Sequence, residues 1–174
     1  MDRGIDFLKS QVNNAVMQHQ TLLDNLESHE QQAEDQRFRD LCTRFIPGMR
    51  EHQRMLEGFQ QQIGAEAGAG KKALGKAMGI AKDIADRARE SDFLRLVSDI
   101  VMARQSEDTF KTFREAGRAL NIQQLAQIGE HGERGHDEFV KEANRLVQQM
   151  FVEHARGAES ALGAAATRSP EVRP

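Results

Sequence analysis

Residues 38–63 read FRDLCTRFIPGMREHQRMLEGFQQQI, the clearest helical pattern in the chain. Apolar residues recur there every three or four positions, which places them on one face of an amphipathic helix. His52 stands where this series lacks an apolar member. Because ionisable side chains are rarely buried unless they are paired or bound to a metal, its position indicates a polar or metal-binding centre. The apolar series is Phe38, Leu41, Phe45, Met49, Leu56, Phe59 and Ile63.

A similar helix precedes this stretch. From Asp2 to about Glu30, apolar residues again recur at spacings of three and four, and the same face includes His19. The polar residues 30–35 between the two patterns predict a turn. The first two helices should therefore form an antiparallel hairpin.

Two further helices are expected after residue 90. The third begins near Ser91 or Asp92, either of which suits an N-cap, and carries Glu107 on its apolar face. After a turn at Asn121, the fourth carries His136 on its apolar face and extends to about residue 155. The apolar residues assigned to the third helix are Phe93, Val97, Ile100, Phe110 and Leu120.

Composition agrees with an all-helical domain and excludes several functions. The 174 residues include no Trp or Tyr and three Pro, and the net charge is -3 with both signs interspersed. No basic patch contains aromatic residues, which argues against a nucleic-acid partner. The N-terminus lacks a signal-peptide layout and no apolar run approaches the ~18 residues of a membrane span, so we expect a soluble cytoplasmic protein without a membrane partner. The single cysteine, Cys42, allows no internal disulfide and is expected to be a packed thiol.

These observations predict one all-α domain at residues 1–155, a four-helix bundle of two antiparallel hairpins. A long crossover at about residues 64–90 should join the hairpins. It begins with a Gly/Ala-rich stretch and continues as a lysine-rich amphipathic segment, which should form an additional short helix. Residues 156–174 are rich in small residues and should form a flexible C-terminal tail.

Counting along the expected helices places four ionisable residues in one layer. His19, Glu107, Glu133 and His136 fall within about one helical turn, ~5 Å, of one another. His52 lies five to seven residues farther along, ~8–10 Å away at 1.5 Å per residue. Two carboxylates and two imidazoles suit a single divalent ion such as Zn²⁺ or Fe²⁺. The four are therefore the candidate metal ligands.

Other interpretations of these residues remain open. Glu107 has Arg104 and Lys111 at helical spacing and suits an ion pair. Glu133 belongs to a run with three glycines, which should loosen the helix and leave its charges solvated. The four residues together suit a buried hydrogen-bonded polar layer without metal. If the helical register is shifted, some of them face solvent.

The third helix with its mid-way acid and the fourth with Glu-x-x-His, residues 133–136, resemble the ferritin-like superfamily, closest to small bacterial ferritin-like stress proteins. Support comes from the segments HQTLL at 19–23 and HQRMLE at 52–57, and the resemblance covers about residues 5–155. It implies a ferritin-like bundle with a di-iron site, using a glutamate on helices one and three and Glu-x-x-His on helices two and four. Here His19 replaces the first glutamate and Pro47 stands where helix two should bring a ligand. The resemblance therefore implies a degenerate or absent di-iron site.

Three functions follow from these patterns. The first is a non-catalytic ferritin-like bundle, for which the resemblance implies a role in the stress response. The second is an iron or zinc metalloprotein for storage, sequestration or weak oxidase activity. The third is an adaptor that binds another protein through the crossover lysines Lys71, Lys72, Lys76 and Lys82. A homodimer through helices one and two is also expected, along a spare apolar strip of Phe7, Val16 and Leu23.

Overall fold

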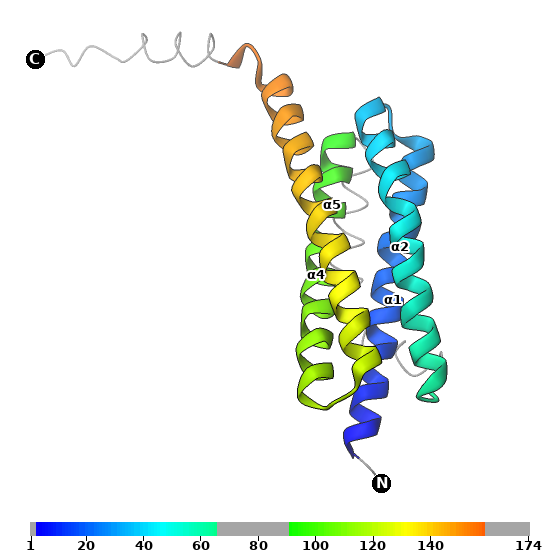
Figure 1. Cartoon of the computed structure of the whole chain (residues 1–174). Coiled ribbons are helices and arrows are strands. Elements are labelled where there is room, and N and C mark those ends of the chain that lie inside the picture. Colours follow the sequence, from blue (N-terminus) through cyan, green and yellow to red (C-terminus); the bar gives the residue numbers. More distant parts are fainter. Residues whose placement is uncertain (1–2, 66–90, 159–174) are drawn as a thin grey trace, which may run out of the picture.

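The chain forms a bundle of four long helices (Figure 1). The computed structural model describes residues 3–65 and 91–158. The predicted all-α bundle of two hairpins is confirmed. None of the described helices has an apolar stretch that would span a bilayer. The additional short helix predicted in the crossover lies outside the described residues. The helices are α1 (Arg3–Gln32), α2 (Gln36–Gln62), α4 (Asp92–Ala119) and α5 (Gln123–Ala155).

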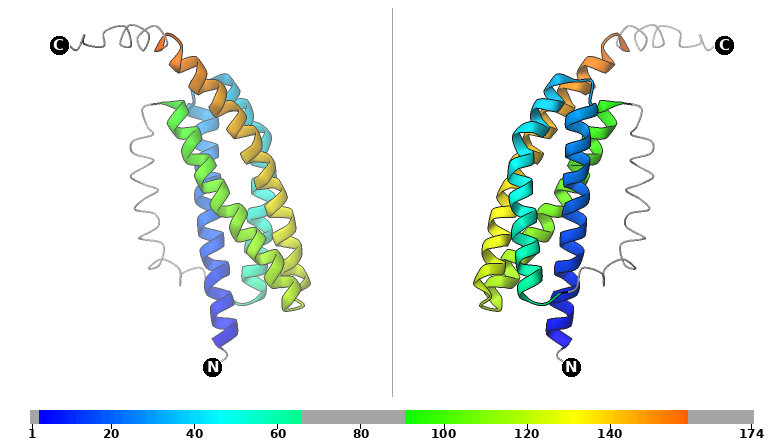
Figure 2. Two further views of the ribbon diagram at one scale, coloured as in Figure 1. Left: turned by 90° about the vertical axis from the view of Figure 1, so that its left-hand side faces the viewer. Right: turned by 90° about the vertical axis from the view of Figure 1, so that its right-hand side faces the viewer.

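Each helix packs against two neighbours around the bundle. The hairpin partners α1 and α2 pack together, as do α4 and α5, while α2 contacts α5 and α1 contacts α4. In Figure 1 the turn between α1 and α2 lies at the top and the turn between α4 and α5 at the bottom; these ends are called upper and lower. Figure 2 shows that the last turns of α5 extend beyond the other helices at the upper end.

Local sequence explains where the helices begin and end. The side chain of Asp35 caps α2 by accepting a hydrogen bond from the backbone N–H of Arg37, 2.8 Å away. Ser91 caps α4 in the same way, as predicted, by accepting from Leu94. Asn121 takes a positive φ of 56°, a conformation that Asn adopts more readily than most residues, and so closes the predicted turn into α5.

Two apolar clusters form the core, one in each half of the bundle. The upper cluster contains the buried thiol of Cys42, whose pKa is raised by burial, as expected of a packed cysteine. Between the clusters lies a layer of buried polar residues. The upper cluster includes Leu22, Leu26, Phe38, Met49, Phe139 and Val140, and the lower one Val12, Leu56, Phe59, Phe110, Leu125 and Ile128.

Glycines allow α4 and α5 to approach closely. A Cβ atom added at Gly117 would overlap the backbone of Ala126, and one at Gly129 would overlap the backbone of Arg114. The glycines of 129–135 were expected to loosen the fourth helix, but α5 is helical throughout this run. Backbone contact with α4 offsets the entropy that glycine loses on ordering.

The spare apolar strip expected on the first helix is not a strip in the structure. Phe7 is 66% exposed, but Leu23 is buried in the upper cluster and Val16 packs against the lower one. The residues do not share one face of α1, because their spacings of nine and seven residues follow the helical repeat only in part. The homodimer itself stays a prediction.

Candidate metal centre

Three histidines from three helices meet in the polar layer. His19 of α1, His52 of α2 and His136 of α5 each offer one ring nitrogen, and these nitrogens all lie within 4.8 Å of one another. The ring centroids are 5.1 Å apart for His19 and His136, 5.4 Å for His52 and His136, and 6.1 Å for His19 and His52. We call these three residues the histidine triad.

Helical periodicity places each member of the triad in the core. His19 follows Val12 and Ala15 on the buried face of α1, and His136 occupies the corresponding face of α5. Side chains of a helix tilt towards its N-terminus. Because α1 and α2 run in opposite directions, the side chains of His19 and His52 tilt towards each other along the bundle axis.

Hydrogen bonds fix the proton of His19 on Nδ1. The amide nitrogen of Gln53 donates to the carboxylate of Glu57 at 2.8 Å, which orients its amide oxygen towards His19. That oxygen accepts a hydrogen bond from Nδ1 of His19 at 2.9 Å. The Nε2 atom of His19 is therefore left with a lone pair, and it is buried with no hydrogen-bond partner.

The proton of His136 is fixed in the same way. Its Nδ1 atom lies 2.7 Å from the backbone carbonyl of Gly132, which only accepts, so Nδ1 carries the proton. Its Nε2 atom is buried without a partner, as is Nδ1 of His52. An unsatisfied buried polar atom costs about 1–3 kcal/mol, so three in one place need an explanation.

Burial keeps the triad neutral at physiological pH. Removal from water lowers the pKa of His19 to about 4, an effect that Gln53 and Glu57 partly oppose. Burial, with smaller contributions from His19 and His131, lowers the pKa of His52 to about 4. The pKa of His136 also falls well below its ordinary value, mainly through burial. Neutral imidazole is the form that binds metals.

A phenylalanine and two glycines shape the surroundings. The ring of Phe110, from α4, lies 5.0–5.8 Å from each of the three imidazoles, so α4 contributes an apolar wall instead of a ligand. A Cβ atom at Gly132 would overlap the ring of Phe110, and one at Gly135 would overlap the ring of His52. Both glycines thus provide space for rings of the centre.

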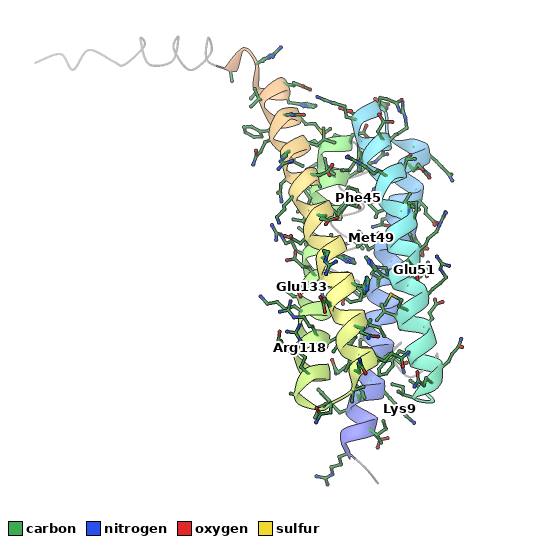
Figure 3. The ribbon with its side chains drawn as sticks, in the orientation of Figure 1. Lys9, Phe45, Met49, Glu51, Arg118 and Glu133 are labelled. Carbon is green, nitrogen blue, oxygen red and sulfur yellow. The ribbon has the colours of Figure 1, made fainter. Side chains whose placement is uncertain are left out.

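The structure brings together two of the four ligands proposed from the sequence. His19 and His136 belong to the triad, whereas Glu107 and Glu133 do not. Glu107 pairs with Arg104 at 3.2 Å, the alternative weighed from helical spacing, and Glu133 pairs with Arg114. Figure 3 shows Glu133 on the α4 side of α5, away from α2.

The apolar face predicted for the third helix was right in part: Phe110 is buried, and Phe93 and Ile100 pack against the upper cluster as partly buried residues. The buried face of α4 includes Leu96, Asp99, Ala103, Ser106 and Phe110, whereas Leu120, assigned to the core, is 62% exposed. Small and polar residues occupy several core positions of α4, so the larger apolar residues beside them gave a misleading pattern. Glu107 lies next to this face and reaches Arg104.

The predicted separation of His52 from the layer was wrong. His19 lies 13 residues before the end of α1 at Gln32, and His52 lies 16 residues after the beginning of α2 at Gln36. This difference of three residues is only about 4.5 Å along the axis, and the opposite tilts of the side chains reduce it further. The missing apolar member of the 38–63 series was the signal that identified His52.

Compared with family models, with curated proteins and with solved structures, the chain gives no match. The interpretation of the centre therefore depends on its geometry.

Proposed function

We propose that this protein binds one divalent transition-metal ion, with Zn²⁺ the best fit, through His19, His52 and His136. The observation that carries the proposal is the convergence of three buried ring nitrogens within 4.8 Å, where three of the buried imidazole nitrogens lack hydrogen-bond partners. Nitrogens bound tetrahedrally to Zn²⁺ at 2.0–2.1 Å lie about 3.3 Å apart. Small rotations of the rings would bring the triad to that spacing.

The ligand chemistry supports zinc over a di-iron centre. Imidazole suits Zn²⁺, Cu²⁺ and Ni²⁺, whereas a bridged pair of irons needs several carboxylates. The group of ligands that the described residues bring together consists of histidines. Three protein ligands also leave a coordination position for water or another small ligand, as in catalytic zinc sites.

A relation to the ferritin-like proteins is part of the same proposal. It is supported by the two hairpins and by the order of the helices, in which α2 ends at the lower end of the bundle and α4 begins at the upper end. A single ion held by three histidines would be a departure from the family's di-iron centre. Sequestration of one zinc ion per chain is the role that we propose for this site.

Metal analysis tests the proposal. Protein purified without a histidine tag and incubated with one equivalent of Zn²⁺ should retain about one ion per chain after desalting. His136→Ala should retain none, and His154→Ala, which removes an exposed histidine of the same helix, should behave as the wild type. Equal retention by both variants would contradict the proposal.

A further inference from the structure

A groove separates α1 from α4 along the lower half of the bundle and extends just past its middle. It encloses about 630 Å³ and extends from Gly4 to Thr21 along α1 and from Met102 to Leu120 along α4. The lining residues are uncharged, although 29% of the chain is charged. Asn14 and Gln18 line it, and the Oδ1 atom of Asn14 and the Nε2 atom of Gln18 are buried without hydrogen-bond partners.

The groove adjoins the histidine triad on both of its helices, because α1 carries His19 and α4 carries Phe110, whose ring contacts His19. Ala15 and Gln18, which line the groove, lie within about one turn of His19 on α1. On α4, Phe113 lines the groove one turn from Phe110, whose ring lies 5.6 Å from that of His19. Any movement of the first hairpin that takes α1 away from α4 and widens the groove therefore also takes His19 away from His136 of the second hairpin.

Hydrogen bonds and ion pairs between the two hairpins lie towards the upper end of the bundle. His29 of α1 is 2.7 Å from the buried carboxylate of Asp99 on α4, and Asp92 accepts from the backbone N–H of Asp35 at 2.7 Å. On the opposite side of the bundle, Arg44 of α2 pairs with Glu142 of α5. These polar contacts join the hairpins above the triad. Most of the groove lies below them, between α1 and α4.

We propose that metal occupancy of the triad regulates the separation of α1 and α4 along the groove. This inference depends on the proposed function, because it requires that the triad binds metal. His19 and His52 belong to the first hairpin and His136 to the second, so a bound ion links the hairpins at the middle of the bundle. With metal bound, α1 stays close to α4. Without it, the unsatisfied nitrogens favour states in which the lower halves separate and water reaches the triad.

The coupling has a reciprocal consequence. A metal ion that favours the closed groove must bind more weakly when the groove is held open, by the same factor in equilibrium constant. The part of α1 that moves away from α4 in the open state therefore also determines where the metal ligand His19 lies. The hydrogen bonds and ion pairs at the upper end confine the movement to the lower end of the bundle.

Hydrogen exchange measured by mass spectrometry tests the inference on the full-length, tag-free protein with and without Zn²⁺. Backbone amides in the lower parts of α1, residues 3–18, and α4, residues 107–119, should exchange about tenfold more slowly with Zn²⁺, because local opening must then break a metal bond. Amides in the upper parts, residues 22–32 and 92–101, should change less than about twofold. His136→Ala and, in the other hairpin, His52→Ala should lose the response, and His154→Ala should keep it.

Isothermal titration calorimetry of the same samples with Zn²⁺ distinguishes failure of the regulation from failure of the proposed function. If Zn²⁺ binds with one ion per chain but slows exchange equally in both halves, or in neither, the regulation is overturned and the proposed function stands. If no Zn²⁺ binds, the proposed function fails and the inference fails with it.

Discussion

The protons of His19 and His136 decide what the centre can bind. Both sit on Nδ1, held by Gln53 and by the carbonyl of Gly132, so both inward-facing Nε2 atoms carry lone pairs. Two lone pairs cannot hydrogen-bond to each other. His52 has at most one proton to give while it is neutral, so the three residues alone cannot form a satisfied polar layer. A metal ion, by contrast, accepts a lone pair from every member.

Gln53 is the positioning residue whose loss should be most informative. Gln53→Leu removes the acceptor that holds the His19 ring, and loss of such a partner typically weakens metal binding by about 10–100-fold. Competition with a zinc chelator measures the affinity. Gln61→Leu, at an exposed position of α2, is the matched control and should bind as the wild type. An unchanged affinity in Gln53→Leu would show that the hydrogen bond to His19 does not organise the site.

The lowered pKa values give the metal-free protein a defined acid sensitivity. The pKa values of His19 and His52 are about 4 in the folded chain, against 6.5 as the ordinary value. Between pH 6.5 and 4 the unfolded chain binds more protons, so stability is complete above pH 6.5 and falls as the pH drops towards 4. At about 1.4 kcal/mol per pKa unit, the loss is on the order of 3 kcal/mol for each histidine.

Urea unfolding of the metal-free protein at a series of pH values measures this loss. His19→Gln should reduce the pH dependence by the share of one histidine, because a neutral amide replaces one titrating ring while His52 and His136 still titrate. A wild-type free energy of unfolding that stays constant between pH 7 and 4.5 would contradict the burial of neutral histidines.

At the scale of the helices, glycines set the fit between α5 and the triad. Gly135 leaves space for the ring of His52, whereas a Cβ atom added at Gly58 of α2 would meet open space. Gly135→Ala should therefore displace His52, destabilise the fold by about 1–3 kcal/mol and weaken zinc binding. Gly58→Ala should instead stabilise the fold by about 0.5–1 kcal/mol, because alanine favours the helix, and leave zinc binding unchanged.

Thermal unfolding and zinc titration of both variants check this pair of outcomes. Equal behaviour of Gly135→Ala and Gly58→Ala would mean that the His52 ring does not depend on the space beside α5. The comparison is matched, since both changes add one methyl group to a helix.

The apolar pattern of each helix decides how much of this site could be predicted from the sequence. Periodicity identified His19 and His136 because large apolar neighbours mark their helix faces. It was only partly right on α4, where Asp99, Ala103 and Ser106 occupy core positions and do not reveal which face is buried. His52 was correctly seen as a core position, but the count along the axis ignored the opposite tilts of side chains on antiparallel helices.

At the scale of the whole molecule, the two hairpins were predictable from the sequence because each turn follows clear capping and polar signals. The closeness of α4 and α5 was not, since it depends on which backbone atoms face Gly117 and Gly129. Hairpin docking also determines the centre, because His136 joins His19 and His52 only in the assembled bundle.

A metal that links the hairpins should raise the stability of the assembled bundle. Zn²⁺ at 100 times its dissociation constant should add about 2.7 kcal/mol, which for a chain of this size raises Tm by roughly 5–10 °C. Differential scanning calorimetry measures the shift. His136→Ala should show none, although His19 and His52 remain within one hairpin. A full shift in that variant would mean that the ion binds elsewhere.

X-ray absorption at the zinc edge tests directly whether His19, His52 and His136 are the ligands of the ion. For the protein loaded with one equivalent of Zn²⁺, we expect a shell of nitrogen or oxygen atoms at about 2.0–2.1 Å and outer-shell scattering from three imidazole rings. A spectrum with carboxylate or solvent ligands and fewer than two imidazoles would contradict it.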